Sequence, residues 1–208
     1  MTSGRAVTSE KYEPQAAAWT DTAYADAAAY LAHRAELVMS LGPPLREGDT
    51  ILDLACGDGG LAAFLPPGVR YLGVDASKAM VAAARRRGAE AERGDLNDYE
   101  PRERVTATTC FRAIYYARDR RAFFERVATY TERKLVFDLN PRQYELEDVR
   151  ADLTAAGLTK LEVRPFFSPQ RVSLPAAPAA ALRVLERTGL LAKLLLRVRF
   201  SYLCAASR

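Results

Sequence analysis

The stretch ILDLACGDGG, residues 51–60, is the feature of this sequence that most restricts its fold. It begins as an apolar run typical of a buried strand, carries a carboxylate at Asp53, and then passes through Gly57, Gly59 and Gly60. A tight turn needs one glycine, so this density of glycines indicates that a ligand or another part of the backbone approaches closely. The stretch therefore predicts a strand followed by a ligand-binding turn.

Around and beyond this turn, the sequence alternates between strand-like and helix-like segments. Helical spacing of apolar residues predicts helices at 78–87 and 119–130, and Ser77 is in position to cap the first of them. Because such alternation builds right-handed crossovers, we expect a mostly parallel sheet covered by helices on both faces. The predicted strands lie at residues 50–55, 71–76, 89–95, 105–111 and 134–139.

The N-terminal part precedes this alternation and has a different pattern. Apolar side chains recur at helical spacing over residues 22–41, and Gly42, with Pro43 directly after it, ends the segment. We expect residues 1–44 to form an N-terminal helical lid and residues 45–208 to form a single folded domain.

The C-terminal part departs from the alternation as well. A helix with an apolar face precedes Gly157, and residues 158–167 alternate like a half-exposed strand. Pro165 favours an edge position or a bulge for that strand, because proline cannot donate a hydrogen bond to a neighbour. A last strand is expected at residues 200–206.

Charge and cysteine content restrict the classes of function. The 208 residues carry a formal net charge of +4, and arginines gather only at 85–87 and 118–121, whereas a nucleic-acid groove needs a denser basic stripe. Nucleic acid is therefore disfavoured as a partner. Neither a disulfide framework nor a metal site is expected from the three widely spaced cysteines, Cys56, Cys110 and Cys204.

Hydropathy gives no sign of membrane insertion. The first residues lack the apolar core of a signal peptide, and the apolar run at 189–200 is too short and too charged to span a bilayer. We expect a cytoplasmic protein, monomeric or homodimeric. Leucines and arginines between residues 179 and 200 leave a peripheral membrane contact open, although a helix that covers the sheet is the ordinary explanation.

The charge of Asp53 discriminates between two classes of ligand for the glycine turn. GDGGLA, residues 57–62, satisfies the G-x-G-x-x-A pattern of dinucleotide sites, and Asp75 follows at a suitable distance for a ribose. A carboxylate at the end of the strand would, however, oppose a pyrophosphate bound at the helix N-terminus. A cofactor with a positively charged group is favoured instead.

Three segments together resemble a known family. ILDLACGDG, YLGVDAS and GDLND are similar, in order and spacing, to the first three cofactor motifs of the class I S-adenosylmethionine-dependent methyltransferases, and TATTCFRAIYY resembles that family's fourth strand. The similarity extends from about Tyr12 to Asp138. It implies an α/β, Rossmann-like, doubly wound and mostly parallel sheet of seven strands, with an antiparallel last strand. It also implies S-adenosylmethionine as cofactor, S-adenosylhomocysteine as product, and no metal.

The resemblance also implies roles for individual residues. Asp53 would lie near the methionyl end of the cofactor, Asp75 would accept hydrogen bonds from the ribose hydroxyls, and Asp95 would receive the adenine amino group. Each of the last two acids could equally be a helix cap or a turn former. Ala55 occupies a position where the family most often has glycine. The implied cofactor-binding residues are Asp53, Ala55, Gly57, Gly59, Asp75, Ala76, Met80, Asp95, Leu96 and Phe111.

The expected reaction is transfer of a methyl group to an oxygen or nitrogen atom of a small molecule, such as a secondary metabolite or a lipid-like compound. Positioning supplies much of the catalysis, so a general base is not obligatory; His33 and Tyr115 are the candidates. His33 could also be a surface histidine of an amphipathic helix. Arg112 or Arg142 could hold an anionic group. The candidate substrate residues are Tyr12, Trp19, Arg112, Tyr116, Asn140 and Arg142.

Two alternatives come from other classes of protein. The chain could be a non-catalytic cofactor-binding or partner protein that has the methyltransferase fold. It could also be an NAD(P)-dependent oxidoreductase, which the charge of Asp53 disfavours.

Overall fold

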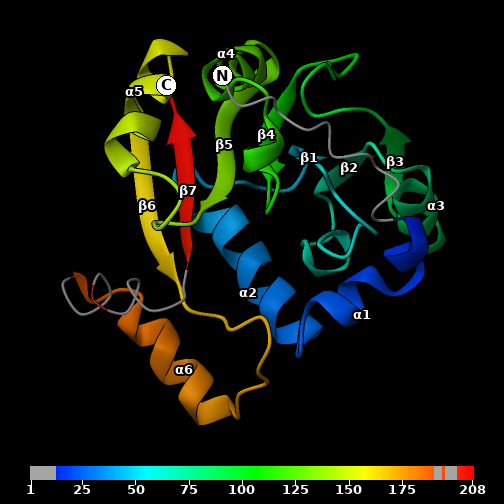
Figure 1. Ribbon diagram of the computed structural model, residues 1–208, viewed down its shortest axis with the longest axis vertical. Coiled ribbons are helices and arrows are strands. Elements are labelled where there is room, and N and C mark those ends of the chain that lie inside the picture. The colour runs from blue at the N-terminus through cyan, green and yellow to red at the C-terminus, as the bar shows by residue number, and fades with distance from the viewer. Residues whose placement is uncertain (1–12, 190–193, 195–200) are drawn as a thin grey trace.

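A seven-stranded sheet runs through the computed structural model, which describes residues 13–189, 194 and 201–208 (Figure 1). The strand order is β3-β2-β1-β4-β5-β7-β6, and only β7 runs antiparallel to its neighbours. The predicted fold class is therefore confirmed. The strands are β1 Thr50–Leu54, β2 Arg70–Asp75, β3 Glu90–Arg93, β4 Val105–Cys110, β5 Thr131–Leu139, β6 Lys160–Phe166 and β7 Ser201–Ser207.

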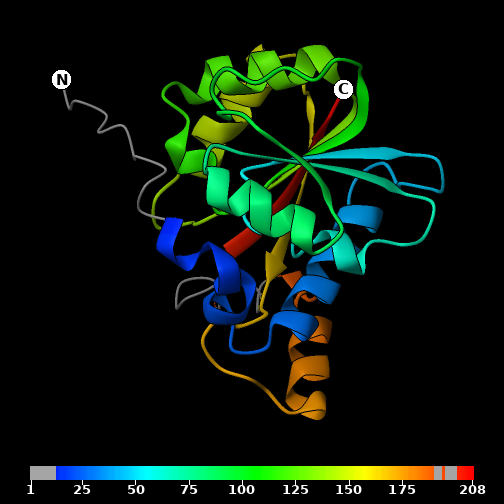
Figure 2. The ribbon, with the colours of Figure 1, turned by 90° about the vertical axis from the view of Figure 1, so that its right-hand side faces the viewer.

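Helices cover both faces of the sheet, as the alternating pattern predicts (Figure 2). Buried residues of α2 pack with Ile51 and Val136 on one face, whereas α4 and α5 pack with Leu52 and Leu135 on the other. Neighbouring residues of one strand thus point to opposite layers. The α-helices are α1 Trp19–Ala23, α2 Ala27–Ser40, α3 Lys78–Arg86, α4 Arg120–Tyr130, α5 Leu146–Ala155 and α6 Ala176–Leu185.

The sheet reverses its winding at β1, and this fixes where a ligand can bind. From β1 the chain proceeds to β2 and then β3 on one side, and it returns to β4 on the other side. Loops that leave the carboxyl ends of β1 and β4 therefore separate, and a crevice opens between them.

The expected helix over residues 22–41 is wrong in its first turn. The chain is extended at Tyr24, and α2 begins only after Asp26, whose Oδ1 accepts a hydrogen bond from Ala29 N at 2.9 Å. Asp26 thereby caps the N-terminus of α2, whose first backbone N–H groups have no acceptor within the helix. The chain therefore forms two helices here in place of one. The aromatic ring of Tyr24 stacks on that of Tyr30 at 4.3 Å between centroids.

Other expected elements differ in detail or fall partly outside the described residues. A single 3-10 turn, η3 Ala62–Phe64, follows the glycine turn and precedes Pro66. Pro165 does lie in an edge strand, because β6 ends the sheet. Within the parts of the chain that the structure describes, no helix has the length and apolarity needed to cross a membrane. The basic segment at 179–200 lies partly outside the described residues, because residues 190–193 and 195–200 are not among them. The boundary at residue 44 stays a prediction.

The cap of α4 provides a test of the fold's local energetics. Asp119 accepts a hydrogen bond from Ala122 N at 3.0 Å, whereas Glu145 in the equivalent position of α5 makes no side-chain capping bond. We expect Asp119→Ala to lower the free energy of unfolding by about 1 kcal/mol. Urea denaturation of Asp119→Ala beside Glu145→Ala measures this, and equal losses in the two variants would contradict the assignment.

Candidate functional site: a cavity rimmed by carboxylates

A cavity of about 440 Å³ lies at the carboxyl ends of β1 to β4, in the crevice that the topology predicts. Its volume is within the range of about 300–1,000 Å³ that small-molecule sites usually have. Residues from the loops after four strands line it, together with side chains of α1 and α2. Asp53, Asp75 and Asp95 all line this one cavity.

Asp53 is buried at the centre of the crevice, and both of its oxygens are occupied. The Tyr71 hydroxyl donates a hydrogen bond to Oδ2 at 2.8 Å, and the Thr109 hydroxyl donates to Oδ1 at 2.6 Å. Burial raises the pKa of Asp53 to about 6, although these two hydrogen bonds and the charge of Arg34 act against the rise. A fixed carboxylate in such a place favours a neighbouring cation.

Asp75 and Asp95 each fix the conformation of a loop through hydrogen bonds to backbone N–H groups. Asp75 accepts hydrogen bonds from the backbone N–H of Gly57 and of Ser77, each at 2.9 Å, so it ties the end of β2 to the glycine turn. Asp95 accepts from the backbone and side-chain nitrogens of Asn97, both at 2.8 Å. Asp95 is therefore a turn former and a residue of the cavity wall at once.

The glycine turn adopts left-handed backbone conformations that explain its composition. Gly57 and Gly59 have φ angles of +59° and +71°, and Ala55 has +58°. Glycine accepts such angles freely, whereas an L-residue such as Ala55 pays roughly 1–2 kcal/mol. A Cβ on Gly57 would lie 3.0 Å from Cδ1 of Trp19, so the indole of α1 lies directly over the turn.

A hydrogen-bonded clasp joins α1 to the same turn. Asp58, within the glycine turn, is 1% exposed and accepts hydrogen bonds from the backbone N–H and the hydroxyl of Thr20. Nη2 of Arg87 lies 3.1 Å from Oδ2 of Asp58 and supplies a compensating positive charge. The sequence analysis missed Asp58, although a charged residue between two glycines of a binding turn is a usable signal.

The opposite side of the cavity carries two arginines and several aromatic rings. Arg34, from the buried face of α2, is 3% exposed, and its guanidinium carbon lies 4.3 Å from the ring centroid of Phe111. Arg112 follows β4, and its backbone N–H donates to Oδ1 of Asp138 at 2.6 Å. The sequence analysis missed Arg34, although a charge amid the apolar stripe of a helix could have indicated it.

Most of the predicted site residues come together in this cavity. Gly59 supports the turn from behind, where an added Cβ would lie 3.0 Å from the Cβ of Ala84. Tyr12 lies outside the described residues. The predicted residues that line the cavity are Trp19, Asp53, Ala55, Gly57, Asp75, Ala76, Met80, Asp95, Leu96, Phe111, Arg112, Tyr115 and Tyr116.

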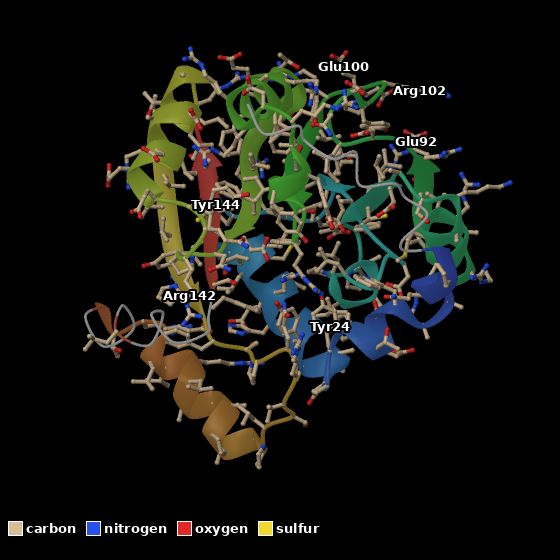
Figure 3. The ribbon with its side chains drawn as sticks, viewed as in Figure 1. Tyr24, Glu92, Glu100, Arg102, Arg142 and Tyr144 are labelled. Carbon is tan, nitrogen blue, oxygen red and sulfur yellow. The ribbon has the colours of Figure 1, made fainter. Side chains whose placement is uncertain are left out.

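Three predicted residues lie elsewhere. His33 is absent from the cavity lining; its Nδ1 lies 2.8 Å from the Ser168 hydroxyl and its Nε2 lies 3.1 Å from Oε2 of Glu186. With both ring nitrogens engaged, this geometry gives a catalytic role for His33 no support. Asn140 and Arg142 also stand outside the lining: Asn140 Oδ1 accepts from Arg142 N within its turn, and Figure 3 shows Arg142 towards β6 and β7, away from Tyr24.

One family model matches the part of the chain that builds most of this site. Residues 51–134 match the family model of a methyltransferase domain. This segment contains the glycine turn and all four aspartates that line the cavity, Asp53, Asp58, Asp75 and Asp95. Over these residues the chain is similar to methyltransferase domains.

Individual proteins are similar to this chain over different shares of its length. Trans-aconitate 2-methyltransferase of Mycobacterium tuberculosis is 36% identical over 84 residues, which are 39% of this chain and 31% of the relative, so the match spans about a third of that protein. A chain in the complex between the Haloferax volcanii Trm112 methyltransferase activator and the putative methyltransferase superposes with a TM-score of 0.67 at 21% identity, over 95% of this chain and 97% of that one.

A second solved structure has the same fold. Haemonchus contortus phosphoethanolamine N-methyltransferase 2, in complex with S-adenosyl-L-methionine, superposes with a TM-score of 0.65 at 15% identity. The superposition covers 100% of this chain and 60% of that chain. At such identities the likeness concerns the fold of the methyltransferase domain.

The clasp between α1 and the glycine turn can be tested by one substitution. Thr20→Val removes the hydroxyl that donates to buried Asp58, so we expect the free energy of unfolding to fall by about 1–3 kcal/mol. The emission of Trp19, the chain's single tryptophan, should shift to the red as α1 loosens.

Thr22→Val is the matched control for this substitution. The Thr22 hydroxyl is exposed and bonds only carbonyl oxygens near its own helix, those of Ala18 and Trp19. We expect a change within about 0.5 kcal/mol. Equal effects of the two substitutions on stability and emission would contradict the clasp.

Proposed function

We propose that this protein transfers a methyl group from S-adenosylmethionine to an oxygen or nitrogen atom of a small molecule. The observation that carries the proposal is the position of three acids, Asp53, Asp75 and Asp95, on the wall of one cavity at the switch point of the sheet. The cofactor is a nucleoside that bears a sulfonium, an ammonium and a carboxylate group, so its net positive charge is opposite to that of this set of carboxylates.

In this proposal, each acid has a separate task. Asp75 binds the ribose hydroxyls at the end of β2, and Asp95 with Leu96 borders the adenine beyond β3. Asp53, between these residues and β4, faces the methionyl group. Ala76 and Met80 supply apolar contacts to the nucleoside, and the left-handed backbone of the glycine turn leaves room for its close approach.

The fold supplies positioning and the exclusion of water. S-adenosylmethionine would bring the activated methyl group, and the residues around it would align an acceptor atom for in-line displacement. Trp19 and Thr20 cover the glycine turn, so α1 shields that side of the cavity from solvent. Tyr115 lines the cavity and remains the candidate for proton transfer, should the acceptor require it.

The named relatives support a small-molecule acceptor. One is named for trans-aconitate and another for phosphoethanolamine, both small compounds. A nicotinamide dinucleotide fits less well, because the buried carboxylate of Asp53 would lie close to its pyrophosphate. A non-catalytic role would leave the two arginines and the aromatic rings beside Asp53 without a ligand.

Removal of Asp75 tests the cofactor placement. We expect Asp75→Ala to weaken the binding of S-adenosylhomocysteine by about 1–3 kcal/mol, or about 5–150-fold, because the ribose hydroxyls lose their acceptor. Calorimetric titration measures the dissociation constant. The control is Asp98→Ala, since Asp98 is exposed, lies outside the cavity and pairs with Arg118 at 3.5 Å. Unchanged affinity in folded Asp75→Ala would show that the ribose binds elsewhere.

The buried state of Asp53 implies a pH dependence of binding. Its pKa of about 6 means that the carboxylate gains its proton, and loses its negative charge, as the pH falls through 6. Affinity for S-adenosylmethionine should therefore rise with pH and be weaker at pH 5 than at pH 7.5 by up to about tenfold. Asp53→Asn should flatten this profile. A profile that keeps its slope in Asp53→Asn would assign the titration to another group.

A further inference from the structure

The cavity has two ends of different chemistry, because its walls come from opposite sides of β1. Loops after β2 and β3 form one end, and α2 with the loop after β4 forms the other. The proposed function assigns the first end to the nucleoside. The second end contains Arg34 and Arg112 and is left for the acceptor.

Arg34 is a buried cation whose hydrogen bonding is incomplete. Its Nη2 donates to the Tyr30 hydroxyl at 2.8 Å and lies 3.7 Å from Oδ2 of Asp138. Aromatic rings of Phe111 and Tyr30 flank the guanidinium, at 4.3 Å and 4.8 Å from its carbon. Its Nε is buried and has no hydrogen-bond partner among the described residues.

Arg112 is half-buried, and contacts fix both its backbone and its guanidinium group. It has a left-handed φ angle of +53°, and its N–H donates to Oδ1 of Asp138. Its guanidinium carbon lies 5.8 Å from the ring centroid of Trp19 and 5.7 Å from that of Tyr24. Nη1 is buried without a partner, and no acidic side chain among the described residues forms an ion pair with Arg112.

The charges at this end do not cancel. Two guanidinium groups are present, and Asp138 is the acid that contacts both residues. Asp53 already accepts hydrogen bonds from Tyr71 and Thr109, and in the proposed function it faces the positive cofactor. One positive charge therefore remains uncompensated in a partly dry cavity, together with two buried N–H groups that lack acceptors. Both conditions are costly unless a ligand supplies an anion.

We propose that a carboxylate group of the acceptor binds between Arg34 and Arg112, so that the acceptor is a small organic acid. This inference rests on the proposed function, because it concerns the second ligand of the same cavity. A carboxylate is planar and accepts from two guanidinium groups at once. It also carries the single negative charge that balances this end, whereas a phosphate dianion would exceed it in the presence of Asp53 and Asp138.

Matched pairs of acid and amide test this inference directly. The probes are benzoate with benzamide, cinnamate with cinnamamide, and hexanoate with hexanamide, and phenyl phosphate serves as the dianion. NMR titration of the isotope-labelled full chain gives each dissociation constant, with and without S-adenosylhomocysteine. We expect each acid to bind about tenfold more tightly than its amide, as a charge-assisted hydrogen bond implies.

Substitution of Arg112 then tests whether this residue causes the preference for the acid over the amide. In Arg112→Gln the ratio of acid to amide affinity should fall towards one. In Arg121→Gln it should be kept, because Arg121 is exposed on α4, pairs with Glu125 and lies outside the cavity. Arg34 is not substituted first, since its buried contacts with Tyr30 and Asp138 make misfolding a risk.

Each remaining outcome has a defined meaning. If acid and amide bind equally tightly to the unaltered protein, or if neither binds, the carboxylate site is overturned. It is also overturned if Arg112→Gln leaves the ratio of acid to amide affinity unchanged. Tighter binding of phenyl phosphate than of benzoate would contradict the proposal and show that the site prefers a phosphate group. The preference for the acid should persist when S-adenosylhomocysteine is bound, and its loss there would assign the arginines to the carboxylate of the cofactor and overturn the acceptor site. Failure of S-adenosylhomocysteine to bind counts against the proposed function instead.

Discussion

A single buried carboxylate governs the chemistry of this cavity. Asp53 lies on the central strand, at the point where the sheet reverses its winding, and two hydroxyl donors fix both of its oxygens. A negative charge in that place selects a positive ligand and disfavours a pyrophosphate. The surrounding elements then give the cavity one end with two further acids, which we propose for the nucleoside, and another end with two arginines, which we propose for the acceptor.

The N-terminal segment contributes to both ends of this division. Through Trp19 and Thr20, α1 covers the glycine turn, and Asp58 within the turn holds α1 in place. Through Arg34, α2 reaches the acceptor end while its apolar face packs against the sheet. The break at Tyr24 that separates the two helices places another aromatic ring on the cavity wall. One short stretch of chain thus shapes the site from two directions.

Local signals in the sequence predicted the alternation of strands and helices and the glycine turn, whereas the number of strands and the antiparallel last strand were implied by the family resemblance. Strands, helices and the cap at Ser77 follow from periodicity and turn chemistry, and the glycines mark a turn whose left-handed angles the structure contains. The acceptor end could not be predicted in the same way. Arg34 and Arg112 lie far apart in sequence and meet only through tertiary packing.

Two individual residues show the same limit. His33 was predicted to be either a candidate base or a surface histidine, whereas it is buried and contacts Ser168 and Glu186. These two partners come from distant segments, whose approach no local pattern reveals. Tyr24 fitted a continuous helical pattern, and the cap at Asp26 together with the stacking on Tyr30 overrode it. Local propensity is a weak guide wherever tertiary contacts compete with it.

The most direct test of the central claim is competitive calorimetry with two cofactors at neutral pH. The account requires S-adenosylmethionine to bind with one site per chain and NADPH to give no heat at the same concentration. NADPH should also leave the affinity for S-adenosylmethionine unchanged. Saturable binding of NADPH that excludes S-adenosylmethionine, or the absence of heat with the sulfonium cofactor, would contradict the account.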